Sequence, residues 1–209
     1  MKKLLILILV LGVVLVAGDA WVRGKVEGRL ASELQESLGS TGDIEVSLGG
    51  FPFVVRALSG SIPVATVRTE RLTRDGMRFT DITMTLRNIR FSLTKVLAGD
   101  LRAIKVGKGE GRAAIDTDAL TRALDRSRND IDVEIVADEI RVSAAGISGT
   151  AEVSIAGNEL VLNIEGLDRV LAIPLPRVVR GISYESVEAV DSHLELVFSL
   201  DDIRLTGLQ

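Results

Sequence analysis

The sequence predicts an α+β fold that is mainly β, with a strongly curved antiparallel sheet wrapped round one N-terminal amphipathic helix. Three observations lead to this prediction. From Asp43 onward apolar and polar residues alternate, which is typical of strands with one face in water and so of an antiparallel sheet. The alternation changes phase within one long strand, which indicates a bent strand and a curved sheet. Residues 20–38 instead have the periodicity of a helix.

An apolar segment opens the chain. Lys2 and Lys3 precede the unbroken apolar stretch Leu4–Gly18. As a helix this stretch is roughly 22 Å long, less than the ~30 Å hydrocarbon core of a bilayer. That length is typical of a signal peptide, but it is close enough to a spanning helix that a retained anchor stays open. We therefore expect residues 1–18 to be a signal peptide or membrane anchor. The leading lysines then place residues 19–209 on the outer side of the cytoplasmic membrane, in the cell envelope, either anchored or released.

The helix predicted over residues 20–38 has an apolar residue at every fourth position and charged residues on its other faces. Gly39 ends this pattern. A curved sheet must cover its concave face, so we expect the helix to pack there and enclose an aliphatic interior. Its apolar positions are Val22, Val26, Leu30, Leu34 and Leu38.

The remaining chain has the pattern of roughly nine or ten strands and a short helix at 117–127. Within residues 77–93 the apolar side chains move from odd to even positions and back to odd. A slip of one residue turns every side chain to the opposite face. The phase must therefore be reset near Asp81 and near Asn88, by bulges or by a turn. No repeat or low-complexity linker divides residues 19–209, and we expect a single domain.

The composition excludes several kinds of chemistry. The 209 residues include no cysteine, which removes disulfides, thiol nucleophiles and thiolate metal sites. The one histidine, His193, lies on the polar face of a predicted strand, and the chain has no G-x-S-x-G nucleophile motif. A net charge of −4 provides no general attraction for nucleic acid. We predict no enzymatic activity, no cofactor, no metal and no nucleic-acid partner.

One segment is unusual. The GFPF box, residues 50–53, contains two of the five phenylalanines and leads into an apolar stretch that includes Val54 and Leu58. Pro52 limits regular strand pairing, so we expect a turn here. Two interpretations stay open. The box either is a core plug that closes one end of the sheet, or forms with the following residues an apolar lip that touches lipid.

The order of these parts resembles the LmeA-like phospholipid-binding proteins, a family of actinobacterial envelope proteins formerly described as a domain of unknown function. The resemblance covers nearly the whole chain. It rests on the signal or anchor, the helix with Arg23 and Glu27, the GFPF box closed by Gly60, and the segment Ile173-Pro174-Leu175-Pro176 before the last hairpin. It implies a fold similar to half of a tubular lipid-binding, BPI-like module, with phospholipid in an apolar groove.

On this resemblance we expect a non-catalytic phospholipid-binding protein of the cell envelope. It would hold acyl chains in the groove between sheet and helix and serve envelope lipid or lipoglycan assembly, with a phospholipid or membrane surface as its partner. The alternatives are a structural or interaction scaffold of the envelope without a ligand, and an envelope hydrolase. The residues expected to bind lipid are Phe51, Pro52, Phe53, Val54 and Leu58 in and after the box, and Val26, Leu30 and Leu34 on the helix.

Overall fold

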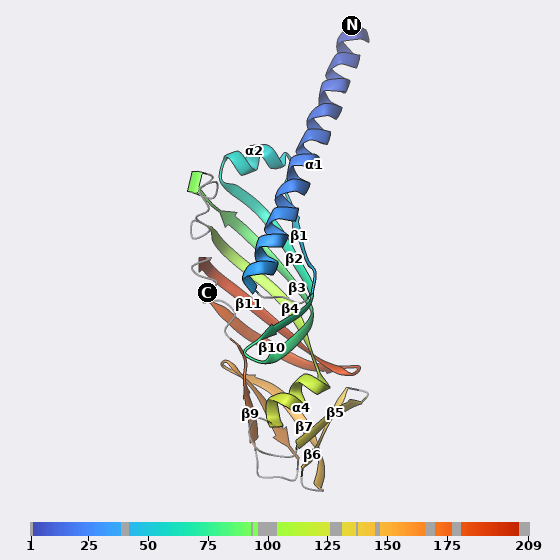
Figure 1. Ribbon diagram of the computed structural model, residues 1–209, viewed down its shortest axis with the longest axis vertical. Coiled ribbons are helices and arrows are strands. Elements are labelled where there is room, and N and C mark those ends of the chain that lie inside the picture. Colours follow the sequence, from blue (N-terminus) through green and yellow to red (C-terminus); the bar gives the residue numbers. More distant parts are fainter. Residues whose placement is uncertain are drawn as a thin grey trace.

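The computed structural model contains two antiparallel sheets and a long N-terminal helix (Figure 1). It describes residues 2–38, 42–92, 94–95, 104–125, 131–136, 138–144, 147–165, 170–176 and 181–204, without the side chains of residues 2–14, 37, 38, 125, 144, 147 and 204. The helices are α1 (Lys2–Leu38), α2 (Phe53–Leu58) and α4 (Thr117–Asp125).

Sheet A has six strands in the order β1-β2-β3-β4-β11-β10, and sheet B has five in the order β5-β6-β7-β8-β9. All the pairings within both sheets are antiparallel, and the predicted fold class is confirmed. The strands of sheet A are β1 (Ile44–Leu48), β2 (Ser61–Arg74), β3 (Met77–Arg90), β4 (Lys105–Asp116), β10 (Ile182–Val190) and β11 (His193–Arg204). Those of sheet B are β5 (Ile131–Val136), β6 (Glu139–Ala144), β7 (Ile147–Ala156), β8 (Glu159–Ile164) and β9 (Val170–Pro174).

Helix α1 runs without a break through the apolar segment and the amphipathic segment that the sequence separates. Its C-terminal part packs against β1 and α2, while its N-terminal part projects beyond the sheets (Figure 1). Over the residues whose side chains the structure describes, no helix is both long enough and apolar enough to cross a membrane. The side chains of residues 1–14 lie outside that description. The assignment of residues 1–18 as signal peptide or anchor therefore stays a prediction.

The two predicted phase changes in β3 are confirmed. Asp81 and Asn88 both adopt left-handed backbone conformations, with φ of 50° and 56°. At Asp81 the register between β3 and β4 shifts, as expected of a bulge. At Asn88 the pairs that flank it keep their register with both neighbouring strands, so the unusual backbone conformation there is not accompanied by a bulge. A bulge bends its strand, and sheet A is curved (Figure 1).

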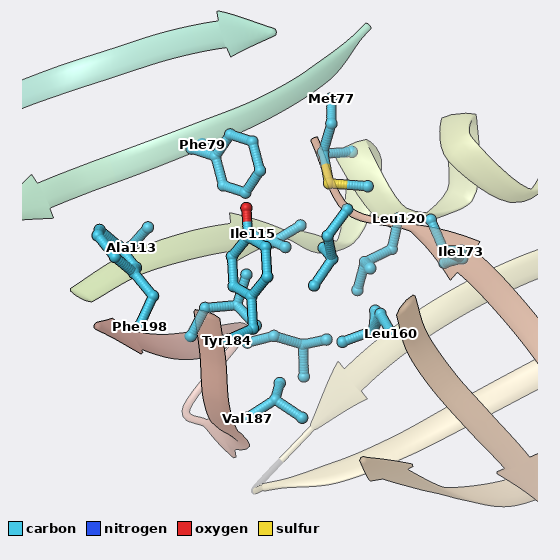
Figure 2. Close-up of a cluster of buried hydrophobic side chains, with 14 of the residues drawn as sticks. Met77, Phe79, Ala113, Ile115, Leu120, Leu160, Ile173, Tyr184, Val187 and Phe198 are labelled. Atoms are coloured by element: carbon cyan, nitrogen blue, oxygen red, sulfur yellow. The ribbon is translucent and has the colours of Figure 1, made fainter. Parts of the chain in front are cut away.

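The prediction of one sheet with nine or ten strands was wrong, because the described residues form eleven strands in two sheets. After β4 the chain passes through α4 into sheet B and returns to sheet A with β10. Both sheets bury one face, so their strands have the same period of two and the period does not assign a strand to either sheet. Figure 2 shows the shared core, where Ile115, Leu120 and Leu160 from β4, α4 and β8 meet and are fully buried.

Candidate functional site

A carboxylate from α1 holds the start of α2. Asp19 is buried, and its two oxygens accept hydrogen bonds from the backbone N–H groups of Phe53, at 2.9 Å, and Val54, at 2.8 Å. The N-cap position of α2 is Pro52, whose side chain makes no capping hydrogen bond. Helix N-termini leave N–H groups unpaired and favour negative charge. Asp19 therefore caps α2 from a distant position in the chain.

The electrostatic setting of Asp19 keeps it ionised. The hydrogen bond from the Val54 N–H lowers the pKa of the carboxyl, burial opposes that effect, and the Phe53 N–H and the Arg23 charge lower the pKa further. Arg23 Nη2 lies 3.4 Å from Asp19 Oδ2 and 3.4 Å from the carbonyl oxygen of Gly50, to which it donates. The same guanidinium lies 5.8 Å from the centre of the Phe53 ring. Arg23 thus joins α1 to the GFPF box.

One further contact fixes α1 along the sheet. The Glu27 carboxylate accepts a hydrogen bond of 2.6 Å from the backbone N–H of Leu48, the last residue of β1. Asp19, Arg23 and Glu27 are spaced four residues apart and so lie on one side of α1. Glu27 binds the end of β1, Arg23 binds Gly50 between β1 and α2, and Asp19 binds the first turn of α2. The helix is therefore held by these polar contacts and by the neighbouring apolar positions, each three residues further on, that pack against the core.

The two phenylalanines of the box have opposite surroundings. Phe53 is only 1% exposed and belongs to the core, whereas Phe51 is 61% exposed. They diverge because the chain bends at residues 51–52 and enters α2 at Phe53. The core-plug interpretation therefore describes Phe53, and the position of Phe51 is that of an outward lip. Whether either ring binds lipid stays a prediction.

The other residues predicted for lipid binding also fall into two groups. Pro52 and Leu58 are exposed, and Val54 is half-buried with its side chain against the core. On α1 the apolar stripe is half-buried along its length and also packs against the core. That stripe consists of Val22, Val26, Leu30 and Leu34. The structure thus brings the box and the helix together at Asp19, but it does not gather all the predicted residues into one cluster.

The sequence reasoning missed the sheet residues that share this environment. On β2 and β3, Val67 pairs with Met84 and lies in register with the buried Val46 of β1, so the three side chains share one face of sheet A. Helix α1 covers β1, and the four apolar residues farther along this face remain half-buried. These four residues and the apolar stripe of α1 are two half-buried apolar surfaces that border the same core. The four residues are Val67, Ile82, Met84 and Leu86. The even-numbered apolar positions of β3 were a signal that could have identified them.

This face of sheet A continues onto β4, where glycines make room for large side chains. A Cβ added at Gly111 would collide with the ring of Phe198, and one added at Gly109 would lie 2.9 Å from side-chain atoms of Leu86 and Leu200. Glycine in a strand interior often marks such a close approach. Toward sheet B the interior is filled: the Tyr184 and Phe198 rings pack edge to face, with 6.3 Å between the ring centres (Figure 2). Burial raises the pKa of Tyr184 to about 12, and its hydroxyl donates to the carbonyl oxygen of Pro176.

The described part of the chain contains no group of three or more histidine, aspartate or glutamate side chains placed to hold a metal ion. His193 is half-buried at the start of β11, and Glu195, two residues further on, forms an ion pair of 3.6 Å with Arg112. Where α1 lies beside sheet A, the prominent feature is the half-buried apolar surface of both the helix and the sheet.

A family model described as LmeA-like phospholipid-binding matches residues 17–209. The chain belongs to this family. Searches of curated proteins and of solved structures gave no significant match. Membership supports lipid binding as the activity of the protein and a phospholipid as its partner. The match includes α1 from Ala17 onward, and therefore the Asp19, Arg23 and Glu27 contacts that hold the helix to the box and β1.

Proposed function

We propose that this protein is a non-catalytic phospholipid-binding protein of the cell envelope, and that acyl chains lie between α1 and sheet A. We call the surface proposed to hold them the acyl face; it consists of the apolar stripe of α1 with Val67, Ile82, Met84 and Leu86. The observation that carries the proposal is the incomplete burial of two apolar surfaces that border one core. The stripe on α1 and the β2–β3 residues are all half-buried, whereas the core toward sheet B is closed. Family membership supports a phospholipid as the molecule that covers them.

The energetics of such a site need no polar chemistry. Burying methylene groups is favourable by ~0.8 kcal/mol each, so a dozen methylenes contribute roughly 10 kcal/mol before the costs of association. Aliphatic side chains such as Val67, Met84 and Leu30 present a surface suited to acyl chains. The exported location and a role in envelope lipid or lipoglycan assembly are part of this proposal. They rest on the apolar N-terminal segment and on the family resemblance.

The test is native mass spectrometry of the purified full chain, with and without a charge on the acyl face. Met84→Glu places a carboxylate opposite Val67 and Gly111, and we expect co-purifying phospholipid to be lost. The matched control is Thr83→Glu, one residue earlier on the opposite face, where the new carboxylate lies across from Arg68 and Arg112. This control should keep its lipid.

Met84→Gln, which is neutral and of similar length, covers the case in which the glutamate variant does not fold. It should bind less lipid than the parent while its far-UV circular dichroism is unchanged. If all three variants carry the same lipid as the parent, the acyl face is not the binding site. If the parent itself carries no lipid from its native membrane, the scaffold alternative is favoured.

A further inference from the structure

Helix α2 has an apolar outer side. Phe53, Val54 and Ala57 pack inward, and the opposite side exposes Val55 by 62% and Leu58 by 67%. The one polar side chain of α2 is that of Arg56, which is also exposed. A surface helix of a globular protein normally has a polar outer side. The outer side of α2 is therefore a surface that favours an apolar neighbour.

The exposed apolar surface continues from α2 onto α1. The hydrogen bonds of Asp19 place this residue beside the first turn of α2. Leu15 precedes it by four residues, so it lies one turn nearer the N-terminus on the same side of α1, and it is exposed. Val16 is also exposed near this side, and Trp21, two residues after Asp19, is exposed at the same level on the opposite side of α1. We define the docking face as Leu15, Val16, Phe51, Val55 and Leu58, with Trp21 at the same level of α1.

The position of the docking face along α1 identifies its occupant. The apolar run Leu4–Gly18 ends one residue before Asp19, and α1 is a single helix through both. Figure 1 shows this N-terminal part projecting past α2, away from sheet B. When the apolar run enters a bilayer, α2 and Trp21 come to lie at the bilayer surface. Tryptophan is enriched at that level of membrane proteins, and Arg56 could pair with a lipid phosphate.

We propose that the docking face seats the protein on a phospholipid bilayer, with α2 lying at the level of the lipid headgroups. This inference goes beyond lipid binding by the acyl face and does not depend on it, because it concerns the membrane surface and not a lipid held within the protein. It explains why Asp19 caps α2. The cap holds the short helix at the point where the apolar run of α1 ends.

The chain is free of cysteine, so single cysteines can carry an environment-sensitive fluorophore. The labelled variants are Val55→Cys and Leu58→Cys, with Val136→Cys as the control. Val136 is also an exposed valine, but it ends β5, far from α2 (Figure 1). The full chain is reconstituted into phosphatidylglycerol–phosphatidylcholine vesicles, with or without lipids that bear a quenching nitroxide near the headgroup. We expect quenching of at least about twofold at positions 55 and 58 and none at 136.

A second readout needs no substitution. Trp21 is the only tryptophan, so the intrinsic fluorescence of the parent reports this residue alone, and brominated lipids should quench it. Labels at 55 and 58 that respond like the label at 136 would overturn the proposal. So would shielding of those labels that depends on protein concentration and not on lipid, because that result assigns the face to a second copy of the chain. Native mass spectrometry of the same variants separates this outcome from failure of the acyl face, since loss of docking leaves bound lipid in place.

Discussion

Replacing Phe53 with alanine should destabilise the protein strongly, whereas the same change at Phe51 should have almost no effect. Phe53 is 1% exposed, packs in the core and lies beneath the Arg23 guanidinium. Truncating a buried phenylalanine removes its transfer free energy and leaves a cavity, which together cost about 3–5 kcal/mol. Phe51 is mostly exposed, so its truncation should change the free energy of unfolding by no more than about 0.5 kcal/mol.

The assay is urea unfolding followed by far-UV circular dichroism, with parent and variants in the same mild detergent. With a denaturant dependence of about 3 kcal/mol per molar urea, the midpoint of Phe53→Ala should fall by roughly 1–1.7 M. The midpoint of Phe51→Ala should stay within about 0.2 M of the parent. Equal midpoints for the two variants would refute the assignment of Phe53 to the core and of Phe51 to the surface.

Three further predictions follow from other contacts. Hydrogen bonds lower the pKa of Asp19 in the folded state, so its carboxylate stabilises the protein at pH values above the ordinary pKa of 3.8, and this contribution is lost as the pH falls through the folded-state pKa. The difference in unfolding free energy between the parent and Asp19→Asn should therefore shrink in that range. A difference that stays constant from pH 7 to pH 2 would contradict the cap. Gly111→Ala should lower the free energy of unfolding in urea by about 1–3 kcal/mol, because the added methyl group collides with the Phe198 ring. Gly24→Ala on α1, where the methyl group meets no other atom, should raise it by about 0.5–1 kcal/mol. An unchanged midpoint for Gly111→Ala would show that the ring has room to move. His193→Ala should leave lipid content unchanged by native mass spectrometry, and a large loss with folding intact would give this histidine a functional role.

Some features of the site followed from the residues themselves. The helical stripe of α1 was predicted from its spacing of four, and its residues do pack against the core. The phase changes at Asp81 and Asn88 were predicted because the apolar residues on either side cannot face one core along a regular strand. The half-buried residues of β2 and β3 were not predicted, because alternation indicates which face is apolar but not how completely another element covers it.

The sequence by itself determined the hydrophobic periodicity of the chain, the two phase changes in β3 and the absence of thiol chemistry, since each depends on residue types or on neighbours within a few positions. Only the tertiary structure decided that Phe53 is buried while Phe51 is exposed, and that the strands divide into two sheets. It also decided that Asp19 caps α2, through hydrogen bonds to residues 34 and 35 positions later. The physical reason is that a buried carboxylate needs partners, and the packing of α1 against β1 and α2 brings those partners to it.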